Sequence, residues 1–284
     1  MSDVRLKEFA AALDEAALTR RALVSGSSGL TGIDDAYAVQ EALVARRLER
    51  GERITGFKLG FTSVAKMRQM GVHDLIHGRI TDRMRIADGG TFDAGTLIHP
   101  RVEPEVAFLL GGPLGPGTVD PLDAVAAVAP ALEIIDSRYD GFTFSLPEVI
   151  ADNTSAAGYA LGAWRSPLEL GNLGVLLELD GRLAEAGSTA AVLGHPLRAL
   201  AAAARLAPPG ALVAGTVVLA GAATAAVPLA AGVHVRATVS GLGTVGFATV
   251  PEASGGRATV PDEDTRRSGA TGDRRPGTTG EPLS

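Results

Sequence analysis

The stretch HPRVEPEVAFLL, residues 99–110, places two glutamates two positions apart in an otherwise apolar run. Its valine, phenylalanine and leucine content favours a β-strand, in which successive side chains alternate between two faces. Glu103 and Glu105 then share one face with Arg101, while the opposite face is apolar. Like charges this close repel one another, so either the face is solvated or a cation lies between the carboxylates.

A third carboxylate stands in PALEIIDSRYDGF, residues 130–142, where apolar residues surround Glu133. A lone buried carboxylate is costly unless it is paired or coordinated. Together with the first two glutamates it would make an all-oxygen site, which suits Mg²⁺ or Mn²⁺. The alternative is that Glu133 pairs with an arginine such as Arg101 or Arg138.

A lysine lies between two glycines in GFKLGFT, residues 56–62, a segment typical of a strand. A partly buried Lys58 can bind a substrate carboxylate, or transfer a proton if its pKa shifts. The alternative is a surface lysine whose stem lies along apolar surface.

The composition excludes several classes of protein. The 284 residues are 46% hydrophobic and 20% charged, which is enough to bury a core, and the net charge of −6 argues against a nucleic-acid binder. The absence of cysteine excludes disulfides, thiolate metal sites and cysteine nucleophiles. The histidines show no zinc-binding spacing, and no G-x-S-x-G elbow is present.

Two segments resemble features that we do not expect them to form. Residues 211–233 are apolar over a membrane-spanning length, but glycines and a proline interrupt them, which favours buried strands with turns. The sequence GLGTVG, residues 241–246, matches a dinucleotide fingerprint, yet a strand-like FATV follows it, which favours a hairpin turn. With no apolar leader at the start, we expect a soluble, cytoplasmic protein without membrane contact.

The organisation along the chain predicts an α+β fold. Apolar periodicity predicts helices over 3–24 and 33–50, and short strands separated by Gly and Pro turns fill 54–250. Two further helices are expected within the strands, over 63–71 and 195–207. We therefore predict a helical N-terminal region (1–53), a catalytic body (54–252) and a disordered tail (253–284), which lacks large apolar residues.

Five motifs occur in order: GFKLGFTSVAKMRQMGV, HPRVEPEVAFLL, PALEIIDSRYDGFTFSLPEVIADNTSAAGY, AAVLGHP and GAATAAVPLAAGVHV. Over roughly residues 5–250 the chain resembles the hydratase/decarboxylase group of the fumarylacetoacetate hydrolase superfamily. The resemblance implies a mixed β-sheet body of the roll or sandwich type with a small helical N-terminal part. It also implies that Glu103, Glu105 and Glu133 hold Mg²⁺ or Mn²⁺.

The resemblance leans toward the decarboxylases of the group. The run IIDSRYDGFTFSLPEVIADN has their form, and Ile76 stands where the hydratases carry a general acid/base. An aromatic residue is common in decarboxylases at the next position, where this chain has His77. The implied reaction is loss of CO₂ from a 2-oxo-3-enedioate in aromatic meta-cleavage-type metabolism. A hydratase on the same scaffold and a non-catalytic partner subunit remain as alternatives.

Further site residues follow from the resemblance alone. Lys58 would hold the leaving carboxylate or protonate the product carbon, and Ser155 and Thr224 would turn hydroxyls toward the substrate. Arg138 and Asp152 would orient the site, or be only structural. The resemblance also implies a homo-oligomer and a possible complex with a cognate hydratase.

Overall fold

Two N-terminal helices begin where the sequence predicts, and the first ends early. The structure is a computed structural model that describes residues 1–26, 29–63, 67 and 74–252. Helix α1 spans Asp3–Thr19 and α2 spans Ile33–Glu49. The predicted helix over 3–24 stops at residue 19 because Arg20 takes a left-handed φ of 55° and Leu23 bonds instead to the carbonyl of Arg138.

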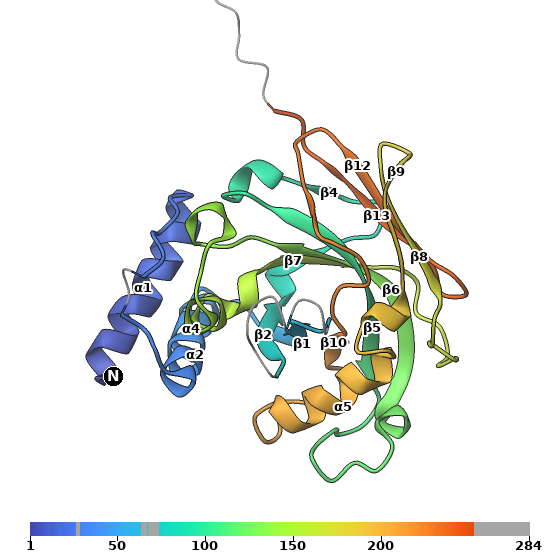
Figure 1. The fold of residues 1–284 in the computed structure, drawn as a ribbon, viewed down its shortest axis with the longest axis horizontal. Coiled ribbons are helices and arrows are strands. Elements are labelled where there is room, and N and C mark those ends of the chain that lie inside the picture. The colour runs from blue at the N-terminus through green and yellow to red at the C-terminus, as the bar shows by residue number, and fades with distance from the viewer. Residues whose placement is uncertain (27–28, 64–66, 68–73, 253–284) are drawn as a thin grey trace, which may run out of the picture. The chain divides into compact units, whose positions relative to one another are not determined.

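Two β-sheets make up the body, and the helices pack beside them (Figure 1). The predicted α+β class is confirmed. The larger has the order β2-β1-β10-β5-β6-β7-β3, with β11 paired to β5. Its strands are β1 (Ile54–Gly60), β2 (Ile76–Thr81), β3 (Arg85–Ile86), β5 (Arg101–Leu110), β6 (Val125–Ile135), β7 (Ala156–Leu161), β10 (Val217–Leu219) and β11 (Val227–Pro228). The smaller has the order β4-β13-β12-β8-β9, formed by β4 (Thr91–Phe92), β8 (Gly174–Leu179), β9 (Arg182–Ser188), β12 (His234–Val239) and β13 (Gly243–Thr249).

Apolar clusters fix the helices to the strands. Helices α1, α2 and α4 (Leu146–Ala151) pack together beside β2, with Leu13, Val39 and Ile150 in their shared core (Figure 1). Helix α5 (Pro196–Leu206) packs through Ala199, Leu200 and Ala203 against the large sheet, and the two sheets share a further core. The prediction of 195–207 for α5 is confirmed to within one residue at each end.

Helix α4 is a helix that the sequence reading missed. Ser145 accepts a hydrogen bond from the backbone N–H of Glu148, and the Glu148 carboxylate accepts one from the backbone N–H of Ser145. This reciprocal pair is the capping box that the S-x-x-E spacing encodes. The apolar residues in this segment also fit the strand-rich pattern predicted over 54–250, so the pattern alone does not reveal the helix.

The segment that resembles a membrane span (211–233) and the segment that resembles a dinucleotide fingerprint (241–246) form the predicted strands and turns. Residues 211–233 contain β10 and β11 with turns between, and GLGTVG closes the antiparallel β12–β13 hairpin. Among the residues that the structure describes, no helix is long and apolar enough to cross a membrane.

Of the predicted domain boundaries, the one at residue 53 lies among the described residues, and the one at residue 252 lies at their end. Met1–Glu252 form one compact unit, and the boundary predicted at residue 53 falls inside it, between α2 and β1. As a domain boundary it stays a prediction. The tail over 253–284 and most of the helix expected over 63–71 lie outside the described residues.

Candidate metal centre and active site

Three carboxylates meet where β5 and β6 pair. Glu103 lies directly opposite Glu133 in the antiparallel register, and Glu105 follows two residues along the same face. One ligand oxygen from each of the three lies within 4.8 Å of the others. Glu103 is 6% exposed and Glu105 and Glu133 are 0% exposed, so the alternative of a solvated strand face is wrong.

The three carboxylates have acceptor capacity that the described residues do not fill. Glu103 Oε2, Glu105 Oε1 and Glu133 Oε2 are buried without a hydrogen-bond partner. Burial, joined by the charges of Glu133 and Glu103, raises the pKa of Glu105 well above its ordinary value. Burial likewise raises the pKa of Glu133 to about 7. Since unpaired buried carboxylates are costly, this donor set fits a hard divalent cation.

One backbone N–H and one glycine orient Glu105. The N–H of Gly221 donates to Glu105 Oε2 at 2.7 Å. Gly221 has a φ of 103°, and a Cβ there would lie 2.0 Å from Oγ1 of Thr62. Only glycine fits, because the φ is left-handed and the approach to Thr62 is too close for a side chain. The loop after β10 therefore directs its donor at the carboxylate cluster.

Lys58 lies inside the same cluster. Its residue is 2% exposed, its Nζ lies 3.1 Å from Glu133 Oε1, and it donates to the carbonyl of Thr154 at 3.0 Å. Burial alone lowers the pKa of Lys58, but Glu133, Glu103 and Glu105 outweigh it and raise that pKa. The surface-lysine alternative is therefore wrong, as is the pairing of Glu133 with an arginine.

The two arginines considered as partners of Glu133 lie elsewhere. The Arg138 side chain pairs with the Asp152 carboxylate and donates to the carbonyl of the same residue, and its backbone N–H donates to Asp152 Oδ2 at 2.9 Å. The guanidinium of Arg101 lies over the ring of Phe142, 4.5 Å from its centroid. The structure thus brings Arg138 and Asp152 together, and their predicted role in orienting the site stays a prediction.

A turn with left-handed backbone covers β1 and β2 beside Lys58. Asn153, Thr154 and Ser155 have φ values of 49°, 52° and 58°, a conformation that costs free energy for residues other than glycine. The Asn153 amide bonds to both backbone groups of Arg79, and a Cβ on Gly78 would lie 2.5 Å from the Asn153 carbonyl. Sequence reasoning missed this turn, since D-N-T-S carries no glycine to signal left-handed residues.

The two predicted hydroxyl residues lie on segments that border the carboxylates. Ser155 Oγ is buried without a hydrogen-bond partner among the described residues. Thr224 is half-buried, three residues after Gly221, and its hydroxyl donates to the carbonyl of Ala225 at 3.0 Å. The Ser155 hydroxyl is thus available to a ligand, while the Thr224 hydroxyl already has an acceptor.

Ile76 and His77 start β2 and face opposite ways. Ile76 is 3% exposed and packs against the position of Gly60, beside Thr154. The His77 ring stacks between Tyr37 and Phe57, with centroid distances of 4.4 and 4.6 Å. Burial, aided by Arg79, lowers the pKa of His77 to about 4, so a neutral aromatic ring fills this position at neutral pH.

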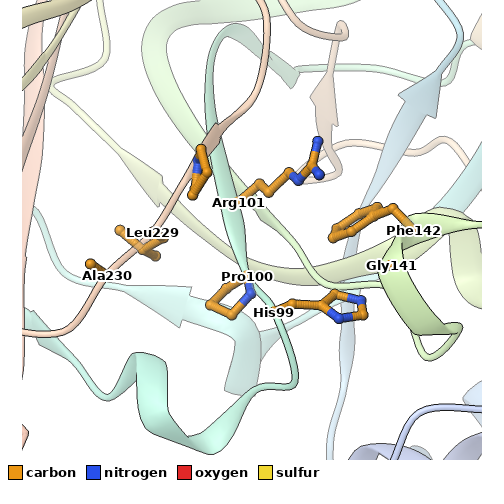
Figure 2. A pocket seen from close by; sticks show the side chains of 8 residues that line it. His99, Pro100, Arg101, Gly141, Phe142, Leu229 and Ala230 are labelled. Atoms are coloured by element: carbon orange, nitrogen blue, oxygen red, sulfur yellow. The ribbon is translucent and has the colours of Figure 1, made fainter.

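A cavity of about 330 Å³ adjoins the start of β5 (Figure 2). His99, Arg101 and Phe142 line one part of it, and Pro228 and Leu229 line another. Figure 2 shows the Arg101 side chain extending toward Phe142. None of the three glutamates lines this cavity, and Arg101, which does, shares its strand face with Glu103.

Comparisons with known proteins agree with this geometry. A 4-oxalocrotonate decarboxylase of a Pseudomonas species is 51% identical over 88% of this chain and all of its own length. A 2-keto-4-pentenoate hydratase of Paraburkholderia xenovorans is 37% identical over 75% of this chain and 82% of its own. The chain belongs to the hydratase/decarboxylase group of the fumarylacetoacetate hydrolase superfamily. No family model matches it.

Solved structures of this superfamily share the fold. The 4-oxalocrotonate decarboxylase of Pseudomonas putida G7, complexed with magnesium and adipate, matches with a TM-score of 0.83 and 36% identity, over 88% of this chain and 99% of its own. A fumarylpyruvate hydrolase of Pseudomonas aeruginosa, at 15% identity and a TM-score of 0.54, covers 69% of this chain and 89% of its own, and shows the fold alone. The predicted mixed-sheet body of this superfamily is confirmed.

Proposed function

We propose that this chain is a metal-dependent decarboxylase that converts a 2-oxo-3-enedioate into a 2-hydroxy-2,4-dienoate and CO₂. The observation that carries the proposal is the buried carboxylate cluster of Glu103, Glu105 and Glu133, whose free oxygens fit a divalent cation. The relatives at 51% and 45% identity are both named 4-oxalocrotonate decarboxylase, and that of P. putida G7 was solved with magnesium.

The three glutamates would hold Mg²⁺ or Mn²⁺. When bound, the cation supplies an electron sink, since it polarises the 2-oxo group of the substrate as negative charge develops there. The chain keeps the ligands in place through the Gly221 N–H on Glu105 and the ammonium of Lys58 beside Glu133. These contacts leave the free carboxylate oxygens pointing into the cluster.

The reaction needs few proton movements from the protein. The bond between C5 and C6 of the substrate breaks, its electron pair moves through the conjugated chain to the 2-oxo oxygen, and that oxygen gains one proton. Lys58 is the cationic group of the cluster and, as a protonated ammonium, carries a proton to give. In this scheme Lys58 holds the leaving carboxylate or supplies the proton, and Ser155 orients the substrate through its unpaired hydroxyl.

Ile76 supports the decarboxylase over the hydratase. Adding water to a dienoate needs a group that moves a proton to or from water, and such a group contributes about 10²–10⁴-fold to the rate. At this position the chain has a buried hydrocarbon side chain. The hydratase is the second candidate, favoured by relatives such as the P. xenovorans enzyme. A non-catalytic partner subunit would not need free oxygens on three buried carboxylates.

Incubation of the purified protein with Mg²⁺ and 2-oxohex-3-enedioate, followed by mass analysis, tests the proposal. We expect CO₂ and 2-hydroxypenta-2,4-dienoate, abolished by EDTA and restored by Mg²⁺ or Mn²⁺. Formation of a 4-hydroxy-2-oxo acid from 2-hydroxypenta-2,4-dienoate, with no CO₂ from any enedioate, would favour the hydratase. The homo-oligomer, the complex with a hydratase and the cytoplasmic location are further parts of the proposal, and they rest on the sequence and the resemblance.

A further inference from the structure

The arginine at the start of β5 has no role in the carboxylate cluster, although it shares a strand face with it. Arg101 precedes Glu103 by two residues, so their Cα atoms are about 7 Å apart at ~3.3 Å of rise per residue. Its ladder partner is Ile135, and Glu103 pairs with Glu133. The Arg101 side chain therefore leaves the sheet on the side where the free carboxylate oxygens lie.

The Arg101 guanidinium has no acidic partner among the described residues. It lies over the Phe142 ring at 4.5 Å, and no ion pair or hydrogen bond with another described residue engages its donors. Asp136 follows Ile135, the residue that pairs with Arg101. Its two carboxylate oxygens already accept hydrogen bonds from the backbone N–H groups of Ile98 and His99, at 3.0 and 2.8 Å. The planar fork of Arg101 is thus free to bind a carboxylate.

A second polar group faces the same ring. His99 packs against Phe142 with 4.8 Å between ring centroids, and its Nε2 is buried without a hydrogen-bond partner among the described residues. His99, Arg101 and Phe142 all line the 330 Å³ cavity (Figure 2). A concave site with an apolar wall and a few polar groups is typical of small-molecule binding.

We propose that Arg101, with His99 and Phe142 beside it, binds a carboxylate of the substrate next to the metal centre. The inference rests on the proposed function, whose substrate carries one carboxylate at the 2-oxo end and one at the far end. Both have the same chemistry, and Arg101 stands two ladder pairs from Glu103 on the same strand face. The Phe142 ring lies under the guanidinium and limits its movement, so the fork is oriented before the ligand arrives.

Equilibrium binding to the Mg²⁺-loaded protein tests the inference without turnover. The probes are oxalate, which resembles the 2-oxo acid end, and adipate, a dicarboxylate without a 2-oxo group. We expect Arg101→Gln to weaken binding of at least one probe on the order of 10- to 100-fold, the range for hydrogen bonds to a charged group. Weaker adipate binding alone assigns Arg101 to the far carboxylate, and weaker binding of both probes assigns it to the 2-oxo end.

Two further variants serve as controls for the Arg101→Gln measurement. Arg79→Gln is the matched control, because the Arg79 guanidinium also lies over a phenylalanine, 5.1 Å from the Phe57 centroid, but outside the cavity. It should leave the binding of both probes unchanged. Arg101→Lys keeps the charge and loses the fork, so it should fold like the wild type and bind the affected probe more weakly.

Unchanged binding of both probes by folded Arg101→Gln and Arg101→Lys would overturn the inference, and Arg101 would then only pack against Phe142. The proposed function fails separately. A protein that binds adipate through Arg101 but releases no CO₂ refutes the decarboxylase alone, whereas normal CO₂ release with unchanged binding in Arg101→Gln refutes this inference alone.

Discussion

Two clusters of buried charge in this protein differ in how completely they are hydrogen-bonded. The Arg138–Asp152 pair is buried, and both oxygens of Asp152 accept hydrogen bonds from Arg138. The cluster of Glu103, Glu105 and Glu133 is equally buried, yet it holds one cation, Lys58, for three carboxylates and leaves several oxygens unpaired. Because an unpaired buried oxygen costs free energy that folding must offset, the incomplete cluster is the one that we propose binds a ligand.

The pair and the cluster should therefore respond oppositely to mutation. Loss of a charge from the complete pair should destabilise the fold, since the other charge is then buried without its counter-ion. Loss of a charge from the incomplete cluster should remove function while it relieves repulsion between carboxylates.

The largest effect on stability is expected for Asp152→Asn. The substitution leaves the Arg138 guanidinium buried without its counter-ion, which typically costs about 3–5 kcal/mol. Urea denaturation measures the loss. Asp74→Asn is the matched control, because Arg205 and Asp74 also form an ion pair, with 2.7 Å between their atoms, but their side chains are 56% and 51% exposed. A loss no larger than that of the control would show that the buried pair does not stabilise the fold.

Glu105→Gln should have the largest effect on activity. It keeps the shape but removes a ligand charge, and we expect Mg²⁺ affinity and CO₂ release to fall by more than about 100-fold, since changes to residues that only support metal ligands already cost 10–100-fold. The metal-free variant should be at least as stable as the wild type, because glutamine replaces a buried carboxyl group whose ionised form burial, Glu133 and Glu103 disfavour. Calorimetric titration with Mg²⁺ and urea denaturation measure the two effects, and unchanged metal affinity would remove Glu105 from the site.

His77 should make the wild type lose stability in mild acid. Its folded pKa of about 4 lies below the unfolded value of 6.5, so the unfolded chain binds the proton first as the pH falls. This contribution is intact above pH ~6.5, and we expect it to fall by about 2 kcal/mol between pH 7 and pH 5. His77→Phe keeps the ring stack, so the difference between its pH–stability curve and that of the wild type isolates the effect.

Ile76→Asp gives the smallest effect and separates decarboxylase from hydratase. The new carboxylate would be buried beside Thr154, whose carbonyl accepts a hydrogen bond from Lys58, and we expect CO₂ release to slow several-fold. Hydration of 2-hydroxypenta-2,4-dienoate should rise slightly, because the variant gains a group that can move a proton. Strong hydration by the wild type would contradict the role assigned to Ile76.

The sequence predicted the parts of the site that lie on one regular strand or in a family motif. The alternation in HPRVEPEVAFLL placed Glu103 and Glu105 on one face, and the structure has β5 with that alternation. The pairing of Lys58 with Glu133 was not predictable, because it joins β1 and β6, which are not neighbours in the sheet. Nor was the left-handed turn at residues 153–155, whose backbone is held by long-range contacts to Arg79 and His77 rather than by local sequence.

Anomalous diffraction from crystals soaked in Mn²⁺ tests the central claim most directly, that the incomplete cluster is a metal centre. We predict one strong anomalous peak among Glu103, Glu105 and Glu133, at bonding distance from the oxygens that have no hydrogen-bond partner. The same soak should leave the Arg138–Asp152 pair without a peak. Absence of a peak at the cluster at saturating Mn²⁺, with Lys58 still paired to Glu133, would contradict the account.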